Sequence, residues 1–293
     1  MPDPQNHPER GLSPHGPAPL PAPRTAAGRA GLAALVADPG AALIGLDFDG
    51  TLAPIVPDPA AARALPGATA VLRRLGERAG TLAVNTGRPA LEAVQYAGLA
   101  QVPGIIVLGH YGRQRWSGGQ LTAPPPPAGL AQARQRLPEV LAAAGAPAGT
   151  RVEDKADALA VHVRGTADPA AALGLLRGPL AELAEQTGLA PEPGRMVIEL
   201  RPPGSDKGRA LRELAAQRPT AAILFCGDDL GDRPAFAAVA QLRAQGIPGV
   251  AVCSGSAEVT GLADEADLVV DGPAGVLALL DALAAAFGSA QGG

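Results

Sequence analysis

Cysteine, aromatic residues and long apolar runs are scarce in this chain of 293 residues. The only cysteines are Cys226 and Cys253, both in apolar strand-like runs, so no disulfide framework is expected and a reducing, cytoplasmic location is predicted. Aromatic residues make up 2% of the chain, which leaves Leu, Val, Ile and Ala to build the core. No apolar segment approaches the roughly 20 residues that span a bilayer, and the first residues lack a signal-peptide pattern, so we expect a soluble protein without a membrane partner.

Positive charge is also limited. The formal net charge at pH 7 is -4, and the arginines are dispersed along the chain. This argues against nucleic acid held on a basic face, whereas a small anionic substrate remains compatible. Of the 24 basic residues, only Lys155 and Lys207 are lysines. Lysine is a compact charge on a narrow stem and arginine a wide planar fork, so we hypothesise that these two sites keep lysine because the fork does not fit.

The order of the apolar runs predicts an α/β fold with a doubly wound parallel sheet. Residues 1–28 are proline-rich and without apolar periodicity, so a disordered tail is expected, with His7 and His15 inert. Strand and helix patterns then alternate, which is typical of a parallel sheet covered by helices. The expected helices of this core are 32–36, 66–79, 89–98, 207–217, 233–245 and 273–287, and the expected strands are 41–47, 81–86, 104–109, 221–227, 249–253 and 268–270.

The stretch 116–203 interrupts this alternation. Prolines 124–127 indicate a hinge, after which helices 130–144 and 169–187 and strands 152–164 (with a break) and 196–201 are expected. A structureless loop of this length is implausible, so we predict an inserted α+β cap domain with a small antiparallel sheet carrying two helices. The core domain is accordingly assigned to residues 29–115 and 204–293.

The clearest chemical signal is the stretch Leu46–Leu52, which reads LDFDGTL. Asp47 and Asp49 leave an apolar strand and enter a Gly-Thr turn, so both carboxylates lie at the strand tip beside free backbone N–H groups. That arrangement suits a phosphate and a hard divalent metal ion. Taken alone, it is also compatible with an ordinary strand-to-turn junction, where Asp and Gly are common.

Two other segments could bind an anion. Thr86-Gly87-Arg88 follows the second strand and precedes a helix, where a hydroxyl and free N–H groups can hold a phosphate oxygen. For this tripeptide alone an ordinary helix cap is the simpler interpretation. Lys207 begins a helix, and a cation at the positive end of a helix dipole indicates an anion nearby.

A third group of polar residues is acidic. Asp228, Asp229 and Asp232 are crowded around a strand end, where they repel one another unless a cation is present. A polar turn capped by Asp232 is the alternative. In a doubly wound sheet, ligands bind beyond the carboxyl ends of the strands, so Asp47, Thr86 and Asp228 are predicted to converge on one crevice.

Together, Asp-x-Asp, Thr-Gly-Arg, Lys and Gly-Asp-Asp-x-x-Asp, in this order, resemble the haloacid-dehalogenase-like phosphohydrolase superfamily. The resemblance implies that Asp47 is the nucleophile that forms an aspartyl-phosphate, and that Asp49 is the general acid and base. It also implies that Thr86 and Lys207 orient the phosphoryl group.

The same resemblance implies a Mg²⁺ cofactor. The metal would be held by the Asp47 carboxylate, the Asp49 carbonyl and Asp228, with Asp232 in support.

Longer segments resemble one family within this superfamily, the trehalose-6-phosphate phosphatases. They are residues 47–59 (DFDGTLAPIVPDP), 151–164 (RVEDKADALAVHVR) and 196–208 (MVIELRPPGSDKG). The implied activity is hydrolysis of trehalose 6-phosphate to trehalose and phosphate, in trehalose biosynthesis. By this similarity Glu153, Lys155 and Glu199 of the cap bind the sugar hydroxyls, with Gly87 and Arg88 also in the substrate site. A solvated strand edge is the alternative for Glu153 and Lys155.

The chain departs from the family pattern at two places. Gly231 and Arg233 replace a Thr and a Glu of the acidic motif, and Gly109-His110-Tyr111-Gly112 replaces the usual His-Gly ending. The first change leaves the effect on the metal site open. His110 is interpreted as a polar strand end, and His162 and Trp116 as structural residues.

Other functions are compatible with parts of the pattern. A phosphatase for sucrose phosphate or mannosyl-phosphoglycerate would use the same chemistry. A receiver domain also assembles acids, a Thr and a Lys, but receivers are short and have no insert of this size. A catalytically inactive sugar-phosphate sensor is disfavoured because no essential residue is missing. The expected partner is a small sugar phosphate, and the oligomeric state is left open, with a monomer as the expectation.

Overall fold

The computed structural model describes residues 19–155, 157–194, 196–255 and 261–290. The first eighteen residues of the predicted tail, with His7 and His15, therefore lie outside the described residues. Residues 19–25 lead into helix α1, which begins at Ala26 rather than near residue 32. Thr25 caps this helix by accepting a hydrogen bond from the backbone N–H of Gly28 at 2.9 Å. The helix is longer than predicted because alanine and glycine dilute the apolar signal of its first turns.

The core is one eight-stranded sheet with the order β12-β11-β10-β1-β2-β3-β4-β5. Neighbours from β12 to β3 are parallel, and β4 and β5 are antiparallel. Strand β1 is central, and Leu46 at its end pairs with Cys226 of β10 and Val84 of β2. The strands are β1 Ala42–Leu46, β2 Thr81–Asn85, β3 Ile106–Gly109, β4 Gln114–Ser117, β5 Gln120–Thr122, β10 Ala222–Gly227, β11 Gly249–Gly255 and β12 Leu268–Asp271.

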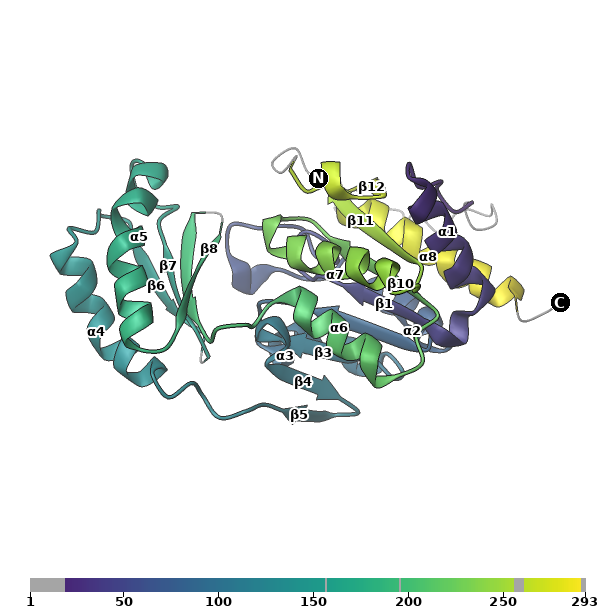
Figure 1. Ribbon diagram of the computed structural model, residues 1–293, viewed down its shortest axis with the longest axis horizontal. Helices are drawn as coiled ribbons and strands as arrows, with labels where there is room; N and C mark the ends of the chain where they lie inside the picture. The colour runs from purple at the N-terminus through teal and green to yellow at the C-terminus, as the bar shows by residue number, and fades with distance from the viewer. Residues whose placement is uncertain (1–18, 156, 195, 256–260, 291–293) are drawn as a thin grey trace, which may run out of the picture.

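Helices cover both faces of this sheet (Figure 1). Successive residues of β1 point to opposite faces: Ile44 belongs to the apolar cluster under α1, α2 and α8, and Leu43 to the cluster under α6 and α7. The strands are apolar throughout because both faces are buried. The core helices are α1 Ala26–Ala37, α2 Ala68–Gly76, α3 Ala90–Tyr96, α6 Lys207–Gln217, α7 Arg233–Ala244 and α8 Gly272–Ala290, and the short 3₁₀ turns are η1 Pro39–Ala41, η2 Pro59–Ala61, η3 Leu99–Gln101, η4 His110–Gly112, η5 Leu230–Asp232 and η6 Ala263–Glu265.

Helix α8 is long and apolar enough, by length and composition, to cross a membrane, contrary to the expectation that no segment qualifies. In the structure, its apolar side chains pack into the core beside α1, α2 and the strands β11 and β12. Val276, Leu280 and Phe287 are fully buried there. Its apolar character is therefore explained by packing within the core.

The cap is a separate antiparallel sheet with two helices on one face, as predicted (Figure 1). Leu159, Val161, Ile198 and Leu200 pack against the helices, and the alternate residues of the same strands face the core. The sheet order is β6-β7-β9-β8, with β6 Arg151–Asp154, β7 Leu159–His162, β8 Ala190–Gly194 and β9 Val197–Arg201, and the helices are α4 Leu130–Ala143 and α5 Pro169–Gln186.

Two features differ from the predicted insert. The predicted boundary at residue 116 falls within β4, because β4 and β5 form a hairpin that extends the core sheet. The separate cap sheet and its helices thus begin after Thr122. Strand β8 was not predicted, since its sequence APEPG contains two prolines, but it is an edge strand, where proline is tolerated.

Candidate active site

Asp47 and Asp49 lie at the carboxyl end of β1, as predicted. The backbone N–H of Asp47 continues the sheet by donating to Cys226 at 2.9 Å, and its side chain is buried. The chain then turns sharply, with Gly50 in the left-handed region at φ 74°. A Cβ atom at Gly50 would lie 2.0 Å from Asp228 Oδ2, so glycine is required for this turn to approach the second acid. Ser254 fixes the turn by donating from Oγ to the Gly50 carbonyl at 2.6 Å.

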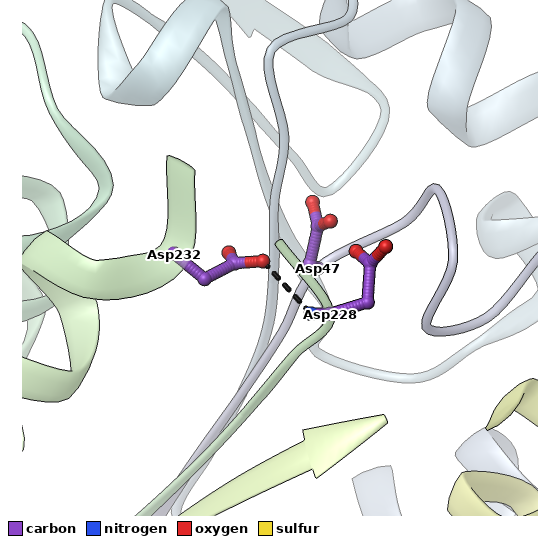
Figure 2. A group of neighbouring side chains, drawn as sticks. All are labelled: Asp47, Asp228 and Asp232. Atoms are coloured by element: carbon purple, nitrogen blue, oxygen red, sulfur yellow. Dashed lines mark hydrogen bonds between the residues drawn. The ribbon is translucent and has the colours of Figure 1, made fainter. Parts of the chain in front are cut away.

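The carboxylates of Asp47, Asp228 and Asp232 converge from β1, the end of β10 and the start of α7 (Figure 2). Each offers an oxygen within 4.8 Å of the others, and all three side chains are buried. Asp232 Oδ2 accepts hydrogen bonds from the backbone N–H groups of Asp228 at 3.0 Å and Asp229 at 3.3 Å. Asp229 caps η5, whereas Asp232, the cap of the alternative interpretation, makes no side-chain cap hydrogen bond to α7.

Lys207 is inserted between two of these acids. Its Nζ lies 2.7 Å from Asp47 Oδ1 and 2.7 Å from Asp232 Oδ1, and only 5% of the residue is exposed. Asp206 caps α6 through the backbone N–H of Arg209, and Asn85 donates to the Lys207 carbonyl at 2.9 Å. The anion expected beside this cation at a helix start is therefore the pair Asp47 and Asp232.

This buried cluster has more acids than cations, so its acids repel one another. Burial raises the pKa of Asp47, although Lys207 opposes the shift. Burial, together with the charges of Asp232 and Asp229, raises the pKa of Asp228 to about 8. Burial alone would lower the pKa of Lys207, but Asp232 and Asp47 raise it well above its usual value, so the lysine stays charged. A divalent cation would relieve the remaining repulsion.

The donor set fits Mg²⁺, which prefers hard oxygen ligands. Asp47 and Asp228 are suited to direct coordination. Both oxygens of Asp232 already bind Lys207 and backbone N–H groups, so this residue is suited to a supporting role. The replacement of Glu by Arg233 does not bring a competing charge into the cluster, because Arg233 pairs with Glu265 at 2.7 Å.

The Thr86-Gly87-Arg88 segment follows β2 and lies beside Asp49. Thr86 is buried and its Oγ1 accepts a hydrogen bond from the backbone N–H of Arg88 at 3.1 Å. The Arg88 guanidinium donates to both oxygens of Asp49, each at 2.7 Å, and lies over the ring of Phe48. Arg88, which was predicted to contact the substrate, is therefore also a partner of the predicted general acid.

The cap residues form ion pairs on the face that looks toward the core. Glu153 Oε2 lies 2.8 Å from His162 Nε2, and this hydrogen bond, against the effect of partial burial, lowers the pKa of Glu153. Lys155 pairs with Glu199 Oε1, and Tyr111 of the core donates to Glu199 Oε2 at 3.0 Å. Glu153 and Lys155 are thus both paired, and Glu153 also lies on the edge strand β6 with 39% of its side chain exposed.

Core and cap residues line a cavity of about 680 Å³. Nearly all predicted site residues line it, and the two exceptions are Asp232 and Glu199, which are not among its lining residues in the described part of the chain. The predicted residues at the wall are Asp47, Asp49, Thr86, Gly87, Arg88, Glu153, Lys155, Lys207 and Asp228.

Several residues of the site were not identified from the sequence. His162 and Tyr111 line the cavity, and Asn85 and Ser254 support it from behind. Tyr111 follows the end of β3, at the same sheet edge as Thr86, so its position along the chain carried a usable signal. His162 gave no such signal, because its role depends on pairing across the cap sheet.

Comparison with known proteins agrees with this geometry. The family model described as trehalose-phosphatase matches residues 45–267, well over half of the chain. The chain belongs to the trehalose-phosphatase family. A trehalose-phosphate phosphatase of Mycobacterium avium is 37% identical over 220 residues, which cover 69% of this chain and 52% of the relative. The chain thus spans about half the length of the curated relatives it matches.

Solved structures have the same fold. A protein described as related to trehalose-6-phosphate phosphatase superimposes with a TM-score of 0.64 at 25% identity, covering 83% of this chain and 97% of the other. The C-terminal domain of the C. albicans trehalose-6-phosphate phosphatase superimposes with a TM-score of 0.68 at 20% identity, covering 92% and 99%. The predicted haloacid-dehalogenase-like core with an inserted α+β cap is therefore confirmed.

Proposed function

We propose that this protein hydrolyses trehalose 6-phosphate to trehalose and phosphate through an aspartyl-phosphate on Asp47. The observation that carries the proposal is the cavity between core and cap, where a buried nucleophile and lysine of the core face a paired Glu, Lys and His of the cap. The core groups suit a phosphoryl group, and the cap groups, which donate and accept hydrogen bonds, suit sugar hydroxyls.

The proposed chemistry uses the core residues of the cavity. An Asp47 oxygen attacks phosphorus in line, the bond from phosphorus to the sugar oxygen breaks, and Asp49 gives that oxygen a proton. Asp49 then takes a proton from a water molecule, whose oxygen attacks phosphorus and releases phosphate and the Asp47 carboxylate. Lys207 orients Asp47, favours its ionised form and offers positive charge to the phosphoryl oxygens, and Thr86 offers its hydroxyl to them.

Arg88 holds Asp49 against the cavity wall before substrate arrives. Both guanidinium hydrogen bonds go to Asp49, and Arg88 and Asp49 line the same cavity. An incoming substrate oxygen can take over one of these hydrogen bonds, which leaves one Asp49 oxygen free to take up from solvent the proton that it then gives to the leaving sugar oxygen. This exchange reconciles a substrate-binding role for Arg88 and Gly87 with the observed pairing.

Mg²⁺ is the proposed cofactor, with Asp47, Asp228 and the Asp49 carbonyl as ligands and Asp232 in support. When bound, it would neutralise phosphoryl charge and the repulsion among the acids. Thermal unfolding tests binding without turnover: 5 mM MgCl₂ should raise the Tm of the wild type and leave that of Asp228→Asn nearly unchanged. An equal shift in both proteins would place the metal elsewhere.

Phosphate release from a substrate panel tests the activity. Trehalose 6-phosphate should exceed glucose 6-phosphate, sucrose 6-phosphate and mannosyl-3-phosphoglycerate by at least about tenfold in kcat/KM, since discrimination by several hydroxyl contacts reaches that size. If another sugar phosphate of the panel is preferred, the family-level substrate assignment is wrong while the phosphatase chemistry stands.

The protein is further proposed to act in the cytoplasm. Cys226 and Cys253 are free and buried in β10 and β11, which suits a reducing compartment. Fractionation of cells that produce the full chain tests this location.

A further inference from the structure

The turn η4, residues His110–Gly112, forms a polar seam between core and cap. Tyr111 Oη donates to Glu199 Oε2 of β9 at 3.0 Å. His110 Nδ1 lies 3.2 Å from Asp157 Oδ2, and Arg113 Nε lies 3.8 Å from the same oxygen. One short segment of the core thus contacts the cap through three side chains.

The backbone of this turn has unusual dihedral angles and is hydrogen-bonded to the Thr86-Gly87-Arg88 segment. His110 and Tyr111 have φ values of 47° and 58°, a region that side chains other than glycine rarely adopt. The Tyr111 N–H donates to the Thr86 carbonyl at 3.0 Å, and the His110 N–H to the Arg88 carbonyl at 3.0 Å. These contacts hold the conformation and fix Tyr111 relative to the Thr86-Gly87-Arg88 segment.

The Tyr111 hydroxyl lies directly against that segment. A Cβ atom at Gly87 would be 2.7 Å from Tyr111 Oη, so only glycine leaves room for the hydroxyl. The Tyr111 ring also lies under the Arg201 guanidinium, 4.1 Å from its central carbon. Burial and the charge of Glu199 raise the pKa of Tyr111, so the hydroxyl keeps its proton for the hydrogen bond to Glu199.

Tyr111 and Lys155 separate Glu199 from the main cavity. Both residues line the main cavity and also a second, small cavity that Glu199 lines. Glu199 is 5% exposed, and its two oxygens already have Lys155 and Tyr111 as partners. The Tyr111 hydroxyl still has lone pairs available, and it lies closer than Glu199 to Gly87.

We propose that Tyr111 is a specificity-determining residue, which accepts a hydrogen bond from a sugar hydroxyl beside Gly87, and that Glu199 acts by positioning Tyr111 and Lys155. This inference rests on the proposed function as a sugar-phosphate phosphatase. It changes the role that family resemblance implies for Glu199, from direct sugar contact to support. Tyr111 also stands where the chain departs from the family's His-Gly ending.

The variant Tyr111→Phe tests the proposal with two substrates, trehalose 6-phosphate and the sugar-free p-nitrophenyl phosphate. The ratio of their kcat/KM values should fall by about 10-fold to 50-fold, mainly through KM, as expected for the loss of one well-placed hydrogen bond. Tyr96→Phe removes the chain's other tyrosine hydroxyl, on α3, and should keep the ratio at its wild-type value. An unchanged ratio in Tyr111→Phe, including an equal loss with both substrates, overturns the proposal.

A double-mutant cycle with Glu199→Gln separates the two roles and remains informative if Tyr111→Phe folds poorly. If Glu199 acts through Tyr111 and Lys155, the substrate ratio of the double variant should lie within about twofold of the ratio in the more impaired single variant. If the losses in substrate ratio of the two single variants multiply in the double variant, Glu199 contacts the sugar independently. Glu199→Gln alone should also lower the substrate ratio, and a wild-type ratio in this variant contradicts its positioning role.

The substrate panel distinguishes failure of this inference from failure of the proposed function. If the wild type prefers another sugar phosphate, the ratio is measured with that substrate and the inference about Tyr111 is tested unchanged. If no sugar phosphate is preferred to p-nitrophenyl phosphate, the proposed function fails and this inference with it.

Discussion

Asp232 and Lys207, at the centre of the core site, are almost completely buried, whereas Glu153 and Lys155 of the cap retain contact with solvent. Asp232 and Lys207 have side-chain exposures of 0% and 5%, compared with 39% for Glu153 and 20% for Lys155. The core groups lie beside the strand ends of a sheet that helices cover on both faces. The cap sheet has helices on one face only, and the cap groups lie on its other face. Under the proposed function, the core is thus preorganised for chemistry that every phosphate ester needs, and the cap can adapt to the sugar.

The strongest test of this division is Asp47→Asn. An amide cannot attack phosphorus, so kcat should fall by about 10⁴-fold or more with trehalose 6-phosphate and with p-nitrophenyl phosphate alike. Phosphate release measures both, and a thermal melt checks the fold. Turnover above about 1% of wild type with either substrate would contradict the nucleophilic role of Asp47.

Lys207→Arg tests the fit of the core lysine. Its Nζ is held at 2.7 Å by both Asp47 and Asp232 in a buried site, which a wider guanidinium cannot enter without displacing them. We expect kcat to fall by about 10²-fold to 10³-fold for both substrates. Wild-type turnover in this variant would remove the argument that lysine is kept for steric reasons.

Stability should show the same contrast between buried and exposed ion pairs. Asp267 of the core is buried, pairs with Arg243 and accepts a hydrogen bond from the Ala251 N–H at 2.8 Å. Asp267→Asn should lower the free energy of unfolding by about 2–4 kcal/mol in urea titrations at pH 7. The matched cap variant is Glu192→Gln. Glu192 pairs with Arg201 at 3.3 Å, and its side chain is 45% exposed, so the substitution should lower the free energy of unfolding by at most about 0.5 kcal/mol.

The pH dependence of this difference has a defined sign. Although burial acts to raise the pKa of Asp267, hydrogen bonds from Arg243, Ala251 and Thr25 lower it overall. A lowered pKa stabilises the folded state above the unfolded value of about 3.9, and this stabilisation is lost as the pH falls through the folded value. The stability gap between wild type and Asp267→Asn should therefore narrow below about pH 4. A gap that widens there would contradict the assigned ion pair.

Lys155→Arg is expected to have a smaller effect on activity than Lys207→Arg. The cap lysine is partly exposed, so an arginine can be accommodated with altered contacts to Glu199. We expect kcat/KM for trehalose 6-phosphate to fall by about 5-fold to 20-fold, with a smaller change for p-nitrophenyl phosphate. If Lys155→Arg and Lys207→Arg gave the same losses with both substrates, the division between core chemistry and cap recognition would not hold.

Most of the core could be predicted because its signals are local. Helix α6 begins at Lys207 and ends at Gln217, as expected, since Asp206 caps its first turn and an apolar stripe follows. The convergence of Asp47, Thr86 and Asp228 followed from a general property of parallel sheets. The hairpin β4–β5 was missed because antiparallel extension of the core sheet is decided by pairing with β3, which no local pattern reveals.

The sequence by itself determined the alternation of strands and helices, the polar strand tips and the order of the motifs, because these depend on local periodicity and chain direction. Only the tertiary structure decided which groups pair: Arg88 with Asp49, Glu153 with His162, and Tyr111 with Glu199. These pairs join residues that are distant in the chain or lie on neighbouring strands of a sheet. Their geometry depends on packing and on which charged groups are buried away from solvent. Local sequence patterns do not encode either of these.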